Sequence, residues 1–286
     1  MKQLFIIKIG GNVVDNPEAL DAFLGNFARI DATKILIHGG GKIATKIGEQ
    51  LGIAPNYING RRITDAATID LVTMVYGGLV NKKIVAKLQA FKCNAIGLTG
   101  ADANIIPAIK RPIVMPVKNA DENASALNTP TLGSGGTAGI DYGFVGDVKS
   151  EAVGVSQLEN LLLSGLTLVV APLTHDGQGQ MLNTNADTIA STLAVSLSKI
   201  YDVRLIYCFE KKGVLEDVED ENSVIKLITK DKYKALKEGN KLFDGILPKI
   251  DNAFAAIDNG VKEVLIGDAN DLLQNTTENT IGTLIK

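Results

Sequence analysis

Residues Lys34 to Leu51 read KILIHGGGKIATKIGEQL. The apolar run Ile35 to Ile37 is typical of a short buried strand, and apolar residues then recur every four positions from Ile43 to Leu51, which predicts a helix. Between the two stand three glycines, Gly39 to Gly41. A strand, a glycine turn and a helix start together present unblocked backbone N–H groups at one spot. Such a spot attracts an anion, for example a carboxylate or a phosphate.

Strand-like and helix-like patterns alternate along the rest of the chain. This alternation predicts a three-layer αβα sandwich around a mainly parallel central sheet. The expected strands cover residues 4–9, 34–37, 95–98, 167–171, 203–209 and 263–266. The expected helices cover residues 17–30, 65–76, 79–91, 155–163, 187–197, 229–238 and 248–261, with a break at Gly77-Gly78 between the second and the third.

Three stretches do not fit this alternation. Residues Tyr57 to Thr64 show no helical period and predict a loop or a ribbon. Residues Ile105 to Val117 alternate and contain two prolines, which favours hairpin strands at an edge. The polar, glycine-rich segment from Lys118 to Gly143 is typical of a long surface excursion.

The composition excludes several classes of protein. A net charge of −3 argues against a broad nucleic-acid surface, which needs a basic face. The most apolar segment, Leu161 to Leu173, is too short to span a membrane. The two cysteines, Cys93 and Cys208, form no CxxC motif and are expected to be buried thiols in a reducing cytoplasm, so no structural metal site is expected.

Two lysines stand in unusual places. Lys8 lies inside the apolar strand FIIKIGG, where a charge is costly unless it reaches water or an anion. Because ligands of parallel sheets collect beyond the carboxyl ends of the strands, Lys8, Gly10, Gly11 and Gly39 to Gly41 are expected to share one crevice. Lys249 falls in the first turn of a helix, a position that disfavours cations, so it requires an anionic partner unless it is a plain surface lysine.

The glycine turn by itself is compatible with other functions. An HGGG oxyanion loop of an esterase requires a Gly-x-Ser-x-Gly elbow, which the chain lacks, so His38 is expected to be structural. Gly39, Gly41 and Ala44 fit the weak G-x-G-x-x-A fingerprint of dinucleotide binding, and Arg61 and Arg62 follow where an acid is usual. An NADP-binding oxidoreductase therefore remains an alternative, as does a non-catalytic sensor of an amino acid or a nucleotide.

Five motifs taken together resemble the acetylglutamate kinases, which belong to the amino acid kinase family. They are, in order, KIGG (8–11), HGGGK (38–42), NGRRIT (59–64), LNTNAD (182–187) and DGILPK (244–249). The resemblance implies two lobes, with residues 1–198 binding the acylglutamate and forming a homodimer and residues 199–286 binding ATP. It also implies transfer of the γ-phosphoryl group of ATP, with Mg²⁺, to the side-chain carboxylate of N-acetyl-L-glutamate in arginine biosynthesis.

The same resemblance implies a role for individual residues. Lys8 and Lys249 would stabilise charge on the migrating phosphoryl group, and Asp187 would hold both lysines. The acylglutamate would contact Gly40, Gly41, Arg62 and Asn183. ATP and its phosphates would contact Gly10, Gly11, Glu210, Gly213, Val214 and Leu215.

The chain departs from its relatives at several points. Phe209-Glu210 stands where relatives commonly carry a small hydroxyl residue followed by Asp. The long segment from Lys118 to Gly143 bears on the acyl pocket, and with Lys110 and Arg111 close by in sequence it leaves N-succinyl-L-glutamate as an alternative substrate. The first strand begins by Leu4, without the preceding helix of arginine-inhibited members, which favours an arginine-insensitive homodimer.

Overall fold

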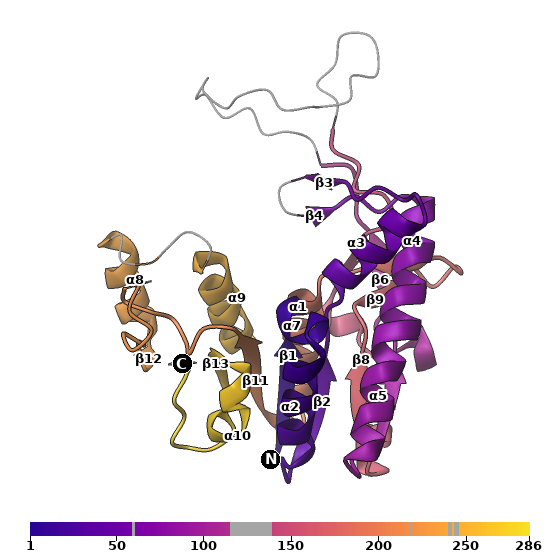
Figure 1. Cartoon of the computed structure of the whole chain (residues 1–286). Coiled ribbons are helices and arrows are strands. Elements are labelled where there is room, and N and C mark those ends of the chain that lie inside the picture. Colours follow the sequence, from indigo (N-terminus) through magenta and orange to yellow (C-terminus); the bar gives the residue numbers. More distant parts are fainter. Residues whose placement is uncertain (59–60, 115–138, 218, 240–241, 243–245) are drawn as a thin grey trace, which may run out of the picture.

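The computed structural model of the protein describes residues 1–58, 61–114, 139–217, 219–239, 242 and 246–286 (Figure 1). Its centre is an eight-stranded sheet in which every neighbouring pair is parallel except β13 with β14. In spatial order the strands are β12 (Leu227–Ile228), β14 (Thr283–Ile285), β13 (Glu263–Asp268), β11 (Tyr201–Phe209), β1 (Lys2–Ile9), β2 (Thr33–Ile37), β8 (Thr167–Val170) and β5 (Ala95–Leu98). The predicted mainly parallel sheet is confirmed.

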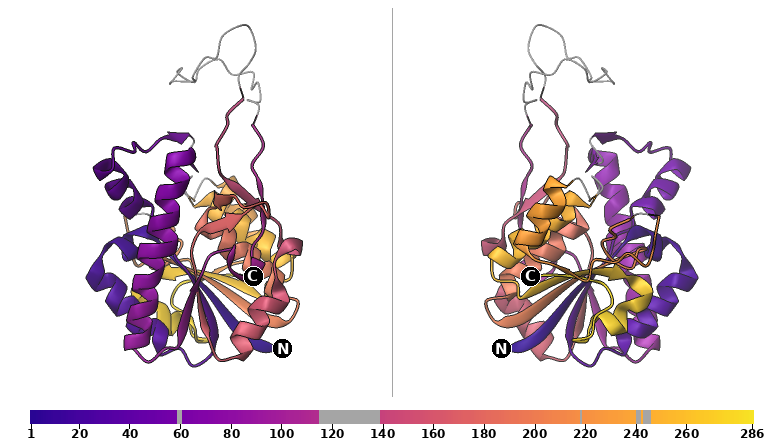
Figure 2. Two further views of the ribbon diagram at one scale, coloured as in Figure 1. Left: turned by 90° about the vertical axis from the view of Figure 1, so that its right-hand side faces the viewer. Right: turned by 90° about the vertical axis from the view of Figure 1, so that its left-hand side faces the viewer.

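Helices cover both faces of this sheet, so the three-layer prediction is also confirmed (Figure 2). Alternate residues of β1 point to opposite cores: Phe5 and Ile7 to one, Leu4 and Ile6 to the other. The first core contains α1 (Gly11–Asp15), α2 (Pro17–Ala28), α3 (Gly41–Gln50), α4 (Ala66–Val72), α5 (Asn81–Ala90) and α10 (Leu272–Asn275). The second contains α6 (Val155–Leu163), α7 (Ala186–Leu197), α8 (Lys230–Glu238) and α9 (Leu247–Asp258).

The predicted helix break at Gly77-Gly78 is wrong. Helix α4 runs into the π-helical segment η1 (Thr73–Val80) and on into α5, which gives one long rod at the edge of the molecule (Figure 1). A Cβ on Gly77 would lie 3.3 Å from Leu173 Cδ1 and 3.4 Å from Thr99 Cγ2. The glycine therefore allows the rod to pack closely against its neighbours rather than ending it.

Three small antiparallel ribbons accompany the main sheet. They are β3 (Tyr57–Ile58) with β4 (Arg61–Arg62), β6 (Ala108–Lys110) with β7 (Gly146–Val148), and β9 (Leu173–His175) with β10 (Met181–Asn183). The first confirms the ribbon expected at residues 57–64. In the second, β6 lies within residues 105–117, where hairpin strands are expected, and its antiparallel partner β7 follows the long polar segment. Most of that segment, from 118 to 138, lies outside the described residues.

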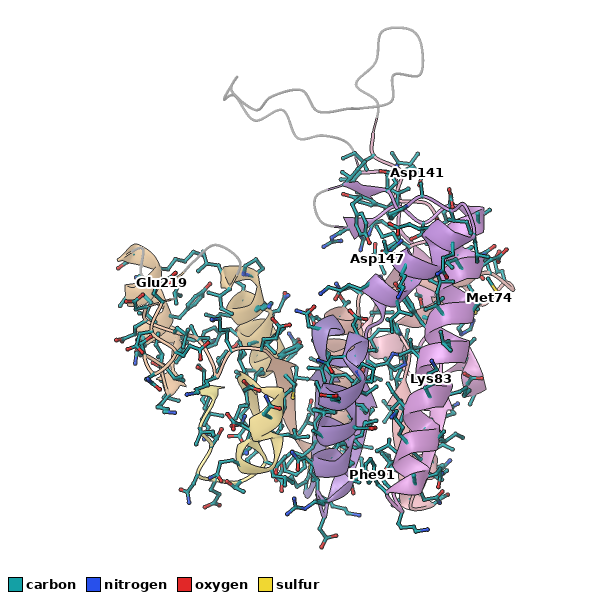
Figure 3. All side chains as sticks on the ribbon, viewed as in Figure 1. Met74, Lys83, Phe91, Asp141, Asp147 and Glu219 are labelled. Carbon is teal, nitrogen blue, oxygen red and sulfur yellow. The ribbon has the colours of Figure 1, made fainter. Side chains whose placement is uncertain are left out.

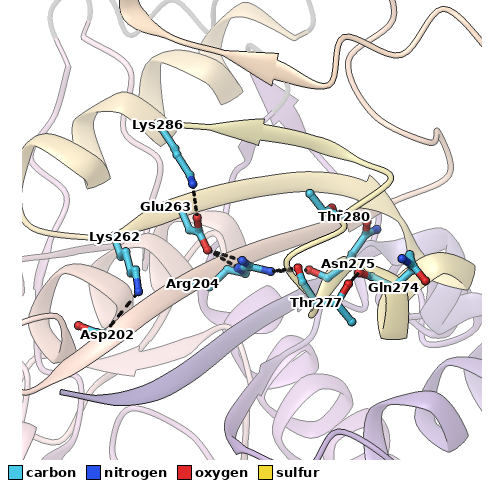
Figure 4. Close-up of polar contacts among 9 residues, drawn as sticks. All are labelled: Asp202, Arg204, Lys262, Glu263, Gln274, Asn275, Thr277, Thr280 and Lys286. Atoms are coloured by element: carbon cyan, nitrogen blue, oxygen red, sulfur yellow. Dashed lines mark hydrogen bonds and ion pairs between the residues drawn. The ribbon is translucent and has the colours of Figure 1, made fainter.

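A buried ion pair ties the C-terminal end of the chain to the sheet (Figure 4). Arg204 on β11 donates from Nε to Glu263 Oε1 on β13 at 2.5 Å, and from Nη1 to the carbonyl oxygens of Asn275 at 3.2 Å and Thr277 at 2.7 Å. Lys286 Nζ lies 3.2 Å from the other oxygen of Glu263. Burial opposes ionisation of Glu263, but Arg204 and Lys286 outweigh it and hold its pKa below the ordinary value.

The sheet runs through both halves of the chain without interruption. The division expected after residue 198 falls at the turn between α7 and β11, and β1 pairs with β11 over eight residues in register. The assignment of one half to the acylglutamate and the other to ATP remains a prediction. No helix in the described ranges combines the length and apolar character that crossing a membrane requires.

Candidate functional site

A cavity of about 550 Å³ opens beyond the carboxyl ends of β1 and β11. Of the residues implied by the sequence, it is lined by Lys8, Gly10, Gly11, Gly41, Asp187, Glu210, Gly213, Leu215 and Lys249. The expected crevice thus holds Lys8 and three of the glycines. Gly39 and Gly40 do not line it, because the turn places them behind Gly41, with Gly40 buried against Tyr76.

Two lysines from opposite ends of the chain meet in this cavity. Lys8 stands near the end of β1, with its side chain only 10% exposed, and its Nζ lies 2.8 Å from Asp187 Oδ1. Asp187 is in the first turn of α7, where the side chain of Asn185 caps the helix by accepting from the N–H groups of Asp187 and Thr188. Asn185 thus caps the helix while Asp187, two residues on, forms the ion pair.

Lys249 enters from the first turn of α9, directly after Pro248. Its Nζ lies 3.6 Å from the centroid of the Phe209 ring, and Lys8 Nζ lies 5.2 Å from the same centroid. Burial lowers the pKa of Lys249 below that of an ordinary lysine. The charge of Lys8 lowers it further, and Asp187 opposes the shift. The arrangement concentrates positive charge at one wall of the cavity, where a phosphoryl group is favourably bound.

The glycine turn is held by a buried histidine. His38 Nε2 accepts a hydrogen bond from Asn81 Nδ2 at 3.2 Å, which leaves Nδ1 to donate to the Gly39 carbonyl at 2.7 Å. Complete burial lowers the pKa of His38 to about 4, so the ring is neutral. The structural role expected for His38 is confirmed. Gly40 has φ of +155°, and a Cβ there would lie 3.0 Å from Tyr76 Cδ1, so the turn requires glycine.

Arg62 lies beside this turn. Among the described residues, all of its hydrogen-bond partners are neutral. Its Nη2 donates to the Gly41 carbonyl at 3.2 Å, to Thr45 Oγ1 at 2.7 Å and to Tyr57 Oη at 2.5 Å. The guanidinium also stacks on the Tyr57 ring, 4.9 Å from its centroid. Because none of these partners is an anion, the charge of Arg62 remains available to a carboxylate of a ligand.

Asn183 joins the same region through Thr64. Its Nδ2 donates to Thr64 Oγ1 at 3.1 Å, and the Thr64 hydroxyl reaches the Arg62 carbonyl at 3.4 Å. Arg62 and Asn183 do not line the main cavity, but Arg62 contacts Gly41, which does. The four residues implied for the acylglutamate thus form a connected region beside the lysines.

The segment implied for ATP is shaped by the C-terminal strand. Val214 is buried rather than lining the cavity, and its N–H donates to Thr283 Oγ1 at 2.7 Å. A Cβ on Gly213 would lie 2.5 Å from the same hydroxyl, so glycine is needed there. Asn275 Oδ1 accepts from the N–H groups of Ile281 at 3.2 Å and Gly282 at 3.0 Å, which fixes the approach to this strand.

Sequence reasoning missed several lining residues. Lys42 contacts the side-chain oxygen of Asn12 across the cavity mouth, and Phe209 forms part of the wall. Lys42 and Asn12 each follow a glycine turn directly, which is the signal that could have identified them. Val13, Lys211, Ile246 and Ile266 complete the lining. The described parts of the chain contain no group of three or more metal-ligating side chains.

Comparison with known proteins gives a consistent result. The chain matches the amino acid kinase family over residues 3–268. The acetylglutamate kinase of Cytophaga hutchinsonii is 55% identical to it, over 99% of this chain and 98% of the relative. The acetylglutamate kinase of Bacteroides thetaiotaomicron is 48% identical, over 100% and 99%.

Solved structures share the fold at lower identity. N-acetylglutamate synthase from Neisseria gonorrhoeae, complexed with coenzyme A and N-acetyl-glutamate, has a TM-score of 0.74 and 21% identity, covering 99% of this chain and 59% of the synthase. Carbamate kinase from Giardia lamblia bound to AMP-PNP has a TM-score of 0.64 and 13% identity, covering 99% of this chain and 98% of the carbamate kinase. With the match over residues 3–268 and the full-length relatives, these findings show that the chain belongs to the amino acid kinase family.

Proposed function

We propose that the chain transfers the γ-phosphoryl group of ATP to the side-chain carboxylate of N-acetyl-L-glutamate, giving N-acetylglutamyl 5-phosphate and ADP, a step of arginine biosynthesis. The observation that carries this proposal is the meeting of Lys8, Asp187 and Lys249 in one cavity. Full-length relatives at 48% and 55% identity carry the name acetylglutamate kinase, which supports the same substrate.

The chemistry needs little beyond positioning and charge. A carboxylate is already ionised at neutral pH and is a nucleophile, so the reaction requires no general base. The transition state of phosphoryl transfer is loose and spreads charge over the phosphoryl oxygens. In our proposal Lys8 and Lys249 stabilise that charge, while Asp187 holds the lysines in place. The N–H groups of Gly11 and Gly41 contribute further donors to the same oxygens, whereas the Gly10 N–H is donated to the Cys208 carbonyl.

The two substrates enter from different sides. Arg62 would bind the α-carboxylate of the acylglutamate, since its present partners are all neutral, and Gly40, Gly41 and Asn183 would complete that site. The segment from Glu210 to Leu215 would lie along ATP. In our proposal the two anions then lie in line across the lysines, which is the condition for direct transfer.

Mg²⁺ belongs to the proposal as a companion of ATP. Kinase sites usually bind this ion through substrate phosphates, waters and one or two carboxylates, so a protein cage is not needed. Asp187 and Glu210 are the carboxylates that line the cavity, and either could face a nucleotide-bound ion. When bound, Mg²⁺ neutralises phosphate charge and favours the leaving ADP.

A cytoplasmic homodimer is the other part of the proposal. Cys93 and Cys208 are buried free thiols, as expected, which suits a reducing compartment. Met74, Leu79 and Phe91 are 56%, 36% and 44% exposed along the rod formed by α4, η1 and α5, and Met74 and Phe91 lie toward its opposite ends (Figure 3). Apolar side chains exposed along one element favour contact with another protein surface. Light scattering after gel filtration measures whether the mass is twice 30.3 kDa.

One assay tests the proposed reaction against its alternatives. ADP release is measured with ATP and Mg²⁺ in the presence of N-acetylglutamate, N-succinylglutamate or glutamate. We expect release with N-acetylglutamate above the other two acceptors. Faster ADP release with N-succinylglutamate would make N-succinyl-L-glutamate the substrate in place of N-acetyl-L-glutamate. The absence of ADP release with all three acceptors would favour a sensor, and quenching of the protein's fluorescence by NADPH would favour an oxidoreductase.

A further inference from the structure

Phe209 stands at an unusual place for an aromatic residue. It is the last residue of β11 and pairs in register with Asp268 of β13, so its backbone is fixed by the sheet. Its ring is partly buried, stacks against Tyr207 with centroids 6.2 Å apart at 20°, and forms part of the cavity wall. The ring is therefore held rigidly within reach of the reacting groups.

The ring lies close to two of the ammonium groups in the cavity, those of Lys8 and Lys249. Lys249 Nζ lies 3.6 Å from its centroid and Lys8 Nζ lies 5.2 Å away. Both distances fall within the range of about 6 Å in which a cation is attracted to the face of an aromatic ring. The closer contact is that of Lys249, which comes from the C-terminal half of the chain.

The charges explain why such a contact is useful. Of the four lysines that line the cavity, Lys8 alone forms an ion pair with a lining carboxylate among the described residues, with Asp187 at 2.8 Å. Two like charges repel each other, and a single carboxylate that pairs with Lys8 cannot give Lys249 an equal partner. The face of Phe209 supplies Lys249 with an uncharged partner that does not compete for phosphate oxygens.

We infer that Phe209 is a positioning residue, whose ring holds the Lys249 ammonium group, and more weakly that of Lys8, ready for the phosphoryl group. This inference rests on the proposed kinase function, since it assigns Lys249 a task in that reaction. A ring holds the cation by its face without a directed hydrogen bond, so all three N–H donors of Lys249 remain available to the ligand.

Two substitutions separate the ring face from its bulk. Phe209→Leu keeps an apolar side chain but removes the face, and Phe209→Tyr keeps the face. We expect Phe209→Leu to lower kcat about five- to thirty-fold, from the usual strength of a desolvated cation–π contact, with little change in KM for N-acetylglutamate. Phe209→Tyr should retain kcat within about two-fold of the wild type. A Phe209→Leu variant that changes only KM for ATP would overturn the inference, because the ring would then be a nucleotide contact.

A double-mutant cycle shows which lysine the ring acts through. If Phe209 works through Lys249, Phe209→Leu should have almost no further effect on kcat in a Lys249→Ala background. In a Lys8→Ala background it should keep most of its effect, because Lys8 is the more distant cation. An equal loss in the wild-type and Lys249→Ala backgrounds would overturn the assignment.

A spectroscopic measurement without substrates keeps this test independent of the kinase assay. In protein labelled at the lysine ε-carbon, the ε-methylene protons of Lys249 should resonate upfield of those of exposed lysines, because nuclei over a ring face are shielded. Lys249→Ala identifies the signal. The upfield shift should persist in Phe209→Tyr and vanish in Phe209→Leu, and its absence in the wild type would refute the contact. Failure of the kinase reaction with an intact shift would count against the proposed function alone.

Discussion

Two regions at the central sheet, among those that hold buried or half-buried cations, satisfy these cations to different degrees. Toward the start of β13, Arg204 has a carboxylate and two carbonyl oxygens as partners, and its Glu263 partner is also reached by Lys286 (Figure 4). At the carboxyl end of β1, the described residues give Lys8 a carboxylate partner in Asp187 and give Lys249 the face of the Phe209 ring. We call the region of Arg204 saturated, because its cation has a full set of protein partners, and such a region can only stabilise the fold. We call the region of Lys8 and Lys249 undersaturated, because its cations have fewer partners and can bind an anion.

The largest effect is expected from breaking the saturated region. Arg204→Met leaves Glu263 buried with Lys286 as its remaining cation and should lower the free energy of unfolding by about 3–5 kcal/mol. Urea denaturation measures the loss, and kcat of the folded enzyme should stay near the wild-type value. The matched control is Arg204→Met combined with Glu263→Leu, which removes both charges and should recover part of the stability. An Arg204→Met variant with wild-type stability and a lowered kcat would contradict this prediction, because the region of Arg204 would then serve catalysis and not stability.

Removing a cation from the undersaturated region should affect catalysis instead. Lys8→Ala and Lys249→Ala are each expected to lower kcat by ~10²–10³, because each removes charge that stabilises the transition state. Steady-state ADP release measures kcat, and urea midpoints close to that of the wild type show that the fold is intact. An unchanged kcat in either variant would remove that lysine from the proposed mechanism.

His38 differs from the cations of both regions because its buried side chain is neutral. Its pKa is about 4 in the fold against an ordinary 6.5, so between these values the unfolded chain binds more protons than the folded one. Stability should therefore fall as the pH drops from 6.5 toward 4, by at most ~3 kcal/mol. Urea denaturation across this range should show a shallower decline for His38→Gln. His175→Gln, which replaces the chain's other histidine, is the control and should keep the wild-type decline.

Arg62 should give the smallest effect, because it is a cation of the site that already has neutral partners. Arg62→Lys loses the planar fork that suits a carboxylate and should raise KM for N-acetylglutamate about ten-fold. KM for ATP and kcat should change little. Initial rates measured over a range of both substrate concentrations separate these constants. A change in KM for ATP alone would show that Arg62 binds ATP and not the acylglutamate.

The sequence was informative wherever the signal was local. The strand, glycine turn and helix from Lys34 to Leu51 appear in the structure as β2, the turn held by His38, and α3. Lys8 was identified by its apolar surroundings and Lys249 by its place in a helix start, and both line the cavity. Family motifs carried most of the remaining candidates, whose individual roles stay predictions.

The features that escaped prediction depend on distant contacts. Gly77 was interpreted as a helix breaker, although its packing against Leu173 and Thr99 lets the helix continue. Arg204 and Glu263 are 59 residues apart, and neither stands in a pattern that indicates its partner. Phe209 was noted as a departure from relatives, but its contact with Lys249 requires knowing that β11 and α9 converge.

The pairing of β1 with β11 over eight residues has a mechanical consequence. Lys8 and Phe209 sit near the ends of these two neighbouring strands, so they are joined by a ladder of backbone hydrogen bonds rather than by a loose linker. Any closing of the two halves over their ligands must bend or twist this ladder. The resistance of the sheet to bending and twisting would then limit how closely the two bound substrates can approach each other.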